Sequence, residues 1–292
     1  MKIRVRFAPS PTGPLHIGGL RTALYNYLYA KKHGGDFILR IEDTDQRRFV
    51  KGSEDYIVDA LTWVGIELDE GGRKDGPFFP YNQSGRKKLY QKHVKQLVAE
   101  GKAYYAFDSD IDLQKLRDEG TRKGGAFLYS AQNRLQLKNS LTMTSQEVDR
   151  ALAEKSFVVR LLVQPNHEIV ISDKVRGTIR VSSNTIDDKI LMKKDGLPTY
   201  HFANVIDDHL MEISTVIRGE EWLPSLALHF LLYEAFDWKR PSFAHLPLIL
   251  NPNGKGKLSK RSGEKGGFPV FPIRWEGETK LTGFKEYGVL SR

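Results

Sequence analysis

The start of the chain alternates between the hydrophobic periods of a strand and of a helix. Apolar and basic residues alternate over residues 2–7, which predicts a strand. Apolar residues then recur at helical spacing over residues 17–28, and this pattern stops at Gly34 and Gly35, where a missing Cβ suits a helix end. The segment between the two patterns is rich in proline and glycine. The sequence therefore predicts a strand, a stiff turn and a helix.

The same alternation continues to about residue 103. Residues 37–42 read as a second strand, and Ser53 is expected to cap a helix that stops at Gly65. A further helix is predicted over residues 85–100. Strands that alternate with helices indicate a parallel sheet covered by helices on its faces.

The pattern changes between Tyr104 and Leu197. Charged helices are predicted over residues 110–119 and after Thr144, which forms a capping box with Glu147. Apolar strands are predicted at residues 157–163, 168–172 and 177–181. We interpret this segment as a domain inserted between two halves of a nucleotide-binding fold.

The sheet is expected to resume near Thr199 and to end with a strand over residues 243–250. The predicted fold class is thus α/β, a Rossmann-like doubly wound parallel sheet split by an inserted α/β domain. The predicted parts are a first half (1–103), the insertion (104–198), a second half (199–250) and a C-terminal loop region (251–292).

Composition narrows the class of protein. The chain has 292 residues and a formal net charge of +9, so a polyanionic partner is plausible. It contains no cysteine, which excludes disulfides and thiolate metal sites. No apolar run approaches the ~20 residues that span a bilayer, and the N-terminus leads into a strand instead of a signal peptide. We expect a cytoplasmic protein without a membrane partner.

The turn over residues 9–20 is a candidate anion site. Gly18 and Gly19 leave no side chain between the backbone N–H groups of the helix start and a ligand. A helix start carries about half a positive charge and several unpaired donors, so it can bind phosphate. His16 stands beside them and can donate to a phosphoryl oxygen. The alternative is an ordinary loop around a buried, satisfied histidine.

A second candidate lies near the other end of the chain. Residues 253–263 combine glycines with four basic residues, among them Lys257 and Lys260, and such a mobile basic loop attracts polyphosphate. By itself this cluster could equally be solvated surface.

Two strand ends carry charges that suit an amino acid. Arg6 and Glu42 follow apolar stretches near the carboxyl ends of predicted strands, where open parallel sheets place their ligands. A cation could hold a carboxylate and an anion could hold an ammonium group. Alternatively, both side chains simply reach solvent.

Together these stretches resemble a known family. His16-Ile17-Gly18-Gly19 and Lys257-Leu258-Ser259-Lys260-Arg261 are similar to the two signatures of class I aminoacyl-tRNA synthetases. Further stretches resemble bacterial-type glutamyl-tRNA synthetases, over residues 3 to about 275; they are residues 6–13, 40–45, 198–209 and 216–223.

The resemblance implies a function. It implies ATP-dependent activation of L-glutamate to glutamyl-adenylate, and transfer to the 3′ terminal adenosine of tRNA(Glu). It also implies that the insertion receives the tRNA acceptor end. ATP would bring Mg²⁺, held mainly by phosphates and water. No protein metal site and no zinc are expected, and a monomer is expected.

The resemblance also implies site residues. Catalytic roles fall on His16, Lys257 and Lys260. ATP binding falls on Ser10, His16, Gly18, Gly19, Glu221, Trp222, Leu223, Lys257 and Lys260. Glutamate binding falls on Arg6, Ala8, Ser10, Glu42, Tyr200, Asn204 and Arg218, with Arg218 expected to pair with the side-chain carboxylate of the substrate.

Some features keep alternatives open. Asp207-Asp208-His209 could suggest a metal, but adjacent residues of a strand or turn point apart, which disfavours one. Basic residues of the insertion could meet phosphates or could be solvated charge; they are Arg122, Lys123, Arg134 and Lys138. The tail beyond Ser262 is too short for the family's stem-contact and anticodon-binding regions, so a truncated catalytic half is expected.

Three other functions compete with this interpretation. The nearest is the paralogous family that glutamylates queuosine within tRNA(Asp), whose length is similar but which usually carries zinc cysteines. The second is a non-catalytic tRNA-binding module. The third is a small-molecule nucleotidyltransferase with a His-x-Gly turn, which would not explain the insertion.

Overall fold

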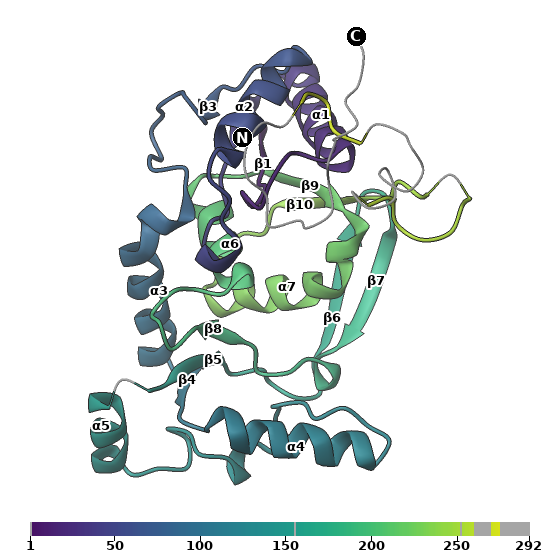
Figure 1. Cartoon of the computed structure of the whole chain (residues 1–292). Helices are drawn as coiled ribbons and strands as arrows, with labels where there is room; N and C mark the ends of the chain where they lie inside the picture. The colour runs from purple at the N-terminus through teal and green to yellow at the C-terminus, as the bar shows by residue number, and fades with distance from the viewer. Residues whose placement is uncertain (1, 155, 252, 260–269, 275–292) are drawn as a thin grey trace.

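The computed structural model describes residues 2–154, 156–251, 253–259 and 270–274 (Figure 1). The first part of the chain contains β1 (Arg4–Phe7), α1 (Ile17–Lys32), β2 (Asp36–Leu39), α2 (Ser53–Trp63), β3 (Glu70–Gly71) and α3 (Lys87–Ala99). The middle part contains β4 (Ala103–Ala106), α4 (Asp110–Arg122), α5 (Ser145–Ala153), β5 (Val158–Leu161), β6 (Glu168–Asp173), β7 (Gly177–Ser182) and β8 (Ile190–Met192). The last part contains α6 (Tyr200–Leu210), β9 (Thr215–Gly219), α7 (Leu226–Ala235) and β10 (Ser242–Leu246).

The central strands are parallel, as predicted. β2 pairs in parallel with both β1 and β3, and β10 pairs in parallel with both β9 and β6. The two groups meet at Ser214, whose N–H donates to the carbonyl of Arg4, the first residue of β1, and whose Oγ accepts from the N–H of Arg4, so that β1 lies beside β9. The α/β fold class is thereby confirmed. Sequence segments about two hundred residues apart form neighbouring strands.

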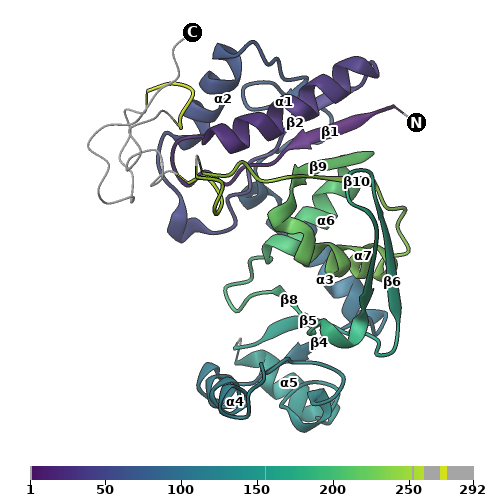
Figure 2. The same cartoon turned by 90° about the vertical axis from the view of Figure 1, so that its right-hand side faces the viewer.

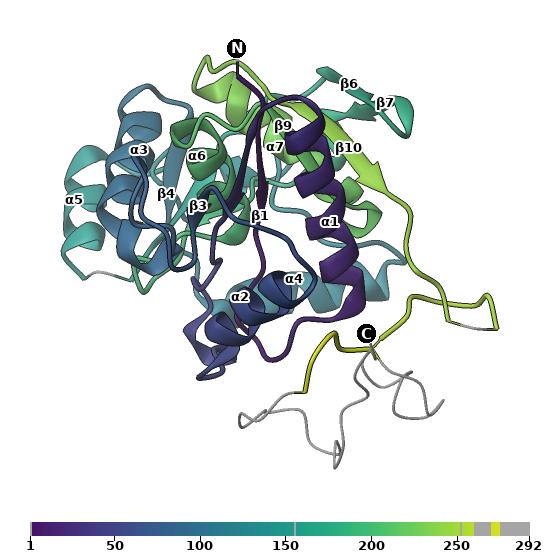
Figure 3. The same ribbon diagram turned by 90° about the horizontal axis from the view of Figure 1, so that it is seen from above.

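Helices cover both faces of these strands. α1 and α2 pack over β1 and β2 around buried residues such as Val5, Ala23 and Ile57. α3, α6 and α7 pack over the opposite face, where Phe202 and Leu232 are fully buried (Figure 1). Seen from above, the start of α1 and the segment that follows β10 lie at the same end of the strands (Figure 3). This end holds the loops in which a parallel sheet places its ligands.

The segment predicted as an insertion contributes to two sheets. β4, β5 and β8 form a separate antiparallel sheet, with α4 and α5 beyond it (Figure 2). The β6–β7 hairpin instead reaches back to the central strands, and the end of β6 pairs with β10 at Phe243. A capping box between Thr144 and Glu147 opens α5, as predicted.

Several local predictions need correction. The second strand stops at Leu39 because Arg40 and Glu42 turn toward buried partners, and the last strand stops at Leu246 because Pro247 cannot donate to the ladder. Gly52, not Ser53, caps α2.

The segment after Thr199 also differs from its prediction. It is a helix and not a strand, so α6 carries Tyr200, Asn204 and the Asp207-Asp208 pair. In the insertion, Arg134 does not face solvent: it is buried, with its Nε 3.1 Å from Asp188, and cannot meet a phosphate. No helix in the described part of the chain is both long and apolar enough to cross a bilayer.

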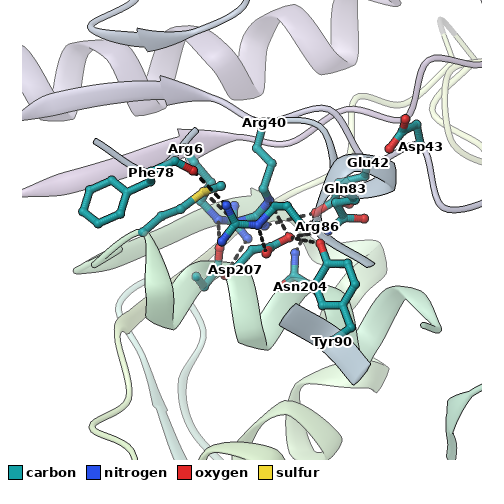
Figure 4. A network of polar contacts seen from close by, with 12 residues as sticks. Arg6, Arg40, Glu42, Asp43, Phe78, Gln83, Arg86, Tyr90, Asn204 and Asp207 are labelled. Atoms are coloured by element: carbon teal, nitrogen blue, oxygen red, sulfur yellow. Dashed lines mark hydrogen bonds and ion pairs between the residues drawn. The ribbon is translucent and has the colours of Figure 1, made fainter. Parts of the chain in front are cut away.

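A buried ionic cluster joins the two halves of the fold (Figure 4). Arg40, fully buried after β2, donates to Asp208 of α6 at 2.7 Å and to Glu42 at 3.1 Å. Asp207 accepts from Arg86 at 2.7 Å and from Tyr90 at 2.8 Å. Breaking such a cluster leaves uncompensated charge in a medium that solvates it poorly.

We therefore expect Arg40→Met to lower the free energy of unfolding by about 3–5 kcal/mol, because it leaves the buried carboxylate of Glu42 without its cation and Asp208 with Arg6 alone. Urea denaturation at neutral pH measures this loss. Arg73→Met is the matched control, because Arg73 makes exposed ion pairs with Asp55 and Asp59 and should cost at most about 1 kcal/mol. Equal losses in the two variants would contradict a structural role for the buried cluster.

Candidate functional site

The turn between β1 and α1 is held in place by hydrogen bonds from both sides. His16 caps α1: its Nδ1 accepts from the backbone N–H of Gly18 at 2.9 Å. Gly13, at a φ of 121°, donates its N–H to Ser53 Oγ at 3.0 Å. A Cβ on Gly19 would lie 2.8 Å from Leu15 Cδ1, so a larger residue at this close-packed position would have to displace that side chain. Because Nδ1 of His16 is an acceptor, the neutral ring carries its proton on Nε2.

Below this turn, Arg6 and Glu42 are both buried and both paired. Arg6 of β1 donates to the two oxygens of Asp208 at 2.9 and 3.1 Å. Glu42 accepts from Arg40 and, at 3.0 Å, from Asn204 of α6 (Figure 4). Burial raises the pKa of Glu42, and the Arg40 and Arg6 guanidinium groups oppose this rise. These charges are fixed by the fold itself, and neither side chain is a simple solvent-exposed strand end.

Arg218, at the carboxyl end of β9, is held differently. Its Nε donates to His245 Nε2 at 3.0 Å, and its Nη1 lies 3.5 Å from His229 Nδ1. Its Nη2 is buried and has no hydrogen-bond partner among the described residues. Burial lowers the pKa of Arg218. A buried guanidinium with an unused donor is suited to an anionic ligand.

Aromatic rings and one lysine also line the cavity. The ring centroids of Tyr200 and Trp222 lie 4.3 Å apart, inclined by 31°. After β10 the described residues pair as a hairpin: Leu250 bridges Lys257 in an antiparallel arrangement, and Leu258 donates to the carbonyl of Ile249 at 2.8 Å. The hairpin places Lys257 Nζ 2.5 Å from Glu221 Oε1. The lysine loop therefore reaches the segment that follows β9.

A cavity of about 650 Å³ connects these groups. Most of the site residues expected from sequence line it: Arg6, Ala8, Ser10, His16, Gly18, Gly19, Glu42, Tyr200, Asn204, Arg218, Glu221, Trp222 and Lys257. Leu223 is not among the lining residues, and Lys260 lies outside the described residues. The expected residues come from both ends of the sequence and share one cavity.

The sequence did not reveal the residues that support this site. Asp208 pairs with Arg6, His245 and His229 hold Arg218, and Asp173 accepts from His245 Nδ1 at 2.6 Å. A weak signal was present for His229 and His245, since each lies in an otherwise apolar stretch, where an ionisable group is seldom buried without a partner. Asp173 and Asp208 have charged neighbours in the sequence and gave no such signal.

The cavity presents two kinds of chemistry. Near the start of α1 it offers backbone N–H groups and an imidazole, and the loop after β10 adds a lysine ammonium; together these groups suit phosphate. Near Glu42 and Arg218 it offers a carboxylate and a guanidinium that face one cavity, which suit a ligand with both charges. Among the described residues, no group of three or more His, Asp or Glu side chains could hold a metal ion.

Comparison with known proteins adds an independent observation. Residues 2–267 match the family described as "tRNA synthetases class I (E and Q), catalytic domain". The chain is 58% identical to a glutamate–tRNA ligase of Christiangramia forsetii and 55% identical to one of Cytophaga hutchinsonii, covering 98% and 99% of this chain but only 58% and 57% of those proteins.

Comparison of the fold with solved structures indicates the same family. The structure matches the crystal structure of a glutamate tRNA ligase from Elizabethkingia meningosepticum, solved in complex with its amino acid, with a TM-score of 0.94 and 54% identity. That match covers 99% of this chain and 57% of the other. The chain thus spans less than two thirds of the length of these relatives.

Proposed function

Because the chain belongs to the class I tRNA synthetases for glutamate and glutamine, as its sequence motifs predicted, we propose that it catalyses ATP-dependent activation of L-glutamate and its transfer to tRNA(Glu). The observation that carries this proposal is the shared cavity, which is lined by candidate phosphate-binding groups from both ends of the sequence and by the carboxylate of Glu42 and the guanidinium of Arg218. A nucleotide and an amino acid can lie side by side in it.

The amino acid is assigned to the deep end of the cavity. The carboxylate of Glu42, held by Arg40 and Asn204, receives the α-ammonium group. Arg218 receives the side-chain carboxylate through its unused Nη2. Ser10, Ala8, Arg6 and Tyr200 complete this part of the wall. Because both charged groups are already in place, little reorganisation accompanies binding.

ATP is assigned to the end at the start of α1. His16, the N–H group of Gly19 and Lys257 surround the phosphates, while the segment with Glu221, Trp222 and Leu223 borders the nucleoside. The N–H of Gly18 is already donated to His16 Nδ1, so Gly18 contributes by leaving room in the turn. Lys260, which the motif also implies, would act on the same phosphates. Mg²⁺ fits this assignment when held by phosphate oxygens and water, since the wall here consists mainly of hydrogen-bond donors.

The chemistry then needs positioning and charge neutralisation. An oxygen of the glutamate α-carboxylate attacks the α-phosphorus of ATP, and the bond to the leaving pyrophosphate breaks. A ribose hydroxyl of the tRNA terminal adenosine next attacks the acyl carbon of the adenylate, and AMP leaves. No enzyme nucleophile takes part. Lys257 neutralises the charge that develops on the pyrophosphate, and the Nε2–H of His16 stabilises it by hydrogen bonding.

The tRNA acceptor end is assigned to the insertion, whose helices α4 and α5 lie at the end of the molecule opposite β1 and α1 (Figure 2). Among its basic residues only those at the surface can meet phosphates, and Arg122 and Lys123 at the end of α4 are exposed. Glutamate-dependent pyrophosphate exchange, with and without tRNA, tests activation directly. Locating labelled glutamate on tRNA distinguishes the 3′ end from a modified internal base.

Arg218→Gln is expected to raise the glutamate KM by about 30-fold or more, because the substrate carboxylate would be buried without its cation. Steady-state pyrophosphate exchange at saturating ATP measures this change. Arg180→Gln is the control, since Arg180 makes an exposed ion pair with Glu168. An unchanged glutamate KM would show that the amino acid lies elsewhere.

Lys257→Gln is expected to lower the rate of adenylate formation by about 10² to 10³, the usual cost of one well-placed donor to developing charge. Single-turnover kinetics at saturating glutamate and ATP measure that step. Lys255→Gln is the matched control, because Lys255 is exposed in the same loop and is not among the residues lining the cavity. Similar rates for both variants would remove Lys257 from the mechanism.

A further inference from the structure

The cationic side chains at the base of the cavity are held by different kinds of partner. Arg6 and Arg40 both donate to Asp208, and Arg40 also donates to Glu42, so carboxylates compensate their charges. Arg218 is buried but lies against the two imidazoles of His245 and His229. No carboxylate among the described residues forms an ion pair with it. Its positive charge therefore stays available.

Hydrogen bonding fixes the protonation of His245. A guanidinium can only donate, so Nε2 of His245 must be the unprotonated acceptor of the bond from Arg218. Nδ1 then carries the proton and donates it to Asp173 Oδ2 at 2.6 Å. Burial, with the adjacent guanidinium, lowers the pKa of His245 to about 4, so the ring is neutral at pH 7. Asp173, His245 and Arg218 form one ordered chain of donors and acceptors.

Asp173 is itself held firmly. Its Oδ1 accepts from the backbone N–H groups of Val175 and Arg176, each at 2.9 Å, and of His245 at 3.3 Å. Its other oxygen is engaged by the imidazole. The turn of the β6–β7 hairpin and His245 of β10 thus fix this carboxylate from both sides.

We propose that Asp173 and His245 are positioning residues that determine substrate specificity in the glutamate pocket: they orient Arg218 through a neutral acceptor and leave its charge for the anionic side chain of the substrate. This inference rests on the proposed function and refines it. A carboxylate placed directly on Arg218 would fix the guanidinium equally well but would compensate its charge. The pocket would then lose its preference for glutamate over the uncharged, isosteric glutamine.

The origin of Asp173 adds a structural consequence. It ends β6, a strand of the segment between the two halves of the fold, and it reaches the pocket because β6 pairs with β10. The same turn contributes Arg176, which pairs with Glu220, and Glu220 accepts from the backbone N–H of Leu248 at 2.8 Å. The hairpin turn therefore holds His245, which contacts Arg218, and also Glu220, which fixes Leu248 of the cavity wall.

Equilibrium binding of glutamate and of glutamine to the complete chain, measured by calorimetry without ATP or tRNA, tests the inference. D173N keeps the shape of the side chain, but its amide N–H₂ group can only donate. It would therefore face N–H groups of the backbone or of the His245 ring, which are donors as well. If the amide turns toward His245, the ring must adopt the other tautomer and oppose Arg218 with an N–H group. We expect glutamate affinity to fall about 10- to 100-fold. Glutamine, which does not need the charge, should change less than about threefold.

The pair H245Q and H245E separates geometry from charge. The two replacement side chains have the same length and both offer an oxygen acceptor to Arg218, but only the side chain of H245E is anionic. H245E is expected to bind glutamate at least about tenfold more weakly than H245Q does, with a smaller preference over glutamine. E168Q is the matched control on the same strand, because Glu168 is exposed and paired with Arg180, and it should bind like the unmodified protein.

The outcomes are distinct. If the unmodified protein binds no glutamate, the proposed function fails, and the inference fails with it. If it binds glutamate, and D173N or H245E retains both that affinity and the preference over glutamine, the inference alone is overturned. Thermal unfolding is recorded for every variant, and if D173N does not fold, the comparison of H245E with H245Q decides.

Discussion

The structure depends on two adjacent aspartates of one helix. Asp207 and Asp208 lie on α6, in the second half of the sequence, yet their partners come from the first half. Asp208 receives Arg6 and Arg40, and Asp207 receives Arg86. Because buried charges need fully matched partners, α6 can take only the position in which all of these bonds form. The ionic cluster thereby fixes the register between the two halves of the fold.

This constraint also builds the site. Arg40 holds Glu42 while it binds Asp208, so the carboxylate that faces the cavity has one orientation. Asn204, one helical turn before Asp208, supports the same carboxylate. The contact that joins the two halves of the fold thus also orients the groups at the amino-acid end of the cavity. The phosphate end is not part of the cluster: it depends on the turn before α1 and on the hairpin that carries Lys257.

Sequence patterns predicted the secondary-structure elements and the family well. They predicted the surroundings of individual side chains less well. Period and capping located β1, α1 and α5, because local hydrogen bonding and burial determine them. The same reasoning assigned a strand near Thr199, where the structure has α6, because a short apolar segment with two aspartates shows no clear helical face. Motifs brought His16 and Lys257 to one site, but nothing local to Asp173 or His245 revealed that the two side chains meet.

Burying charged groups in a pocket costs free energy, so the arrangement of these groups calls for a functional reason. Replacing ion pairs by apolar contacts often leaves a protein as stable or more so, so pairing alone gives no reason to bury Arg6 and Glu42. Preorganised charge does give a reason, since a ligand with charges at fixed separation then binds without moving the protein. Arg218 is preorganised as well, but its partners are neutral imidazoles instead of carboxylates. Neutral imidazoles fix its geometry while its charge remains uncompensated, so the ligand itself completes the electrostatic balance of the cavity.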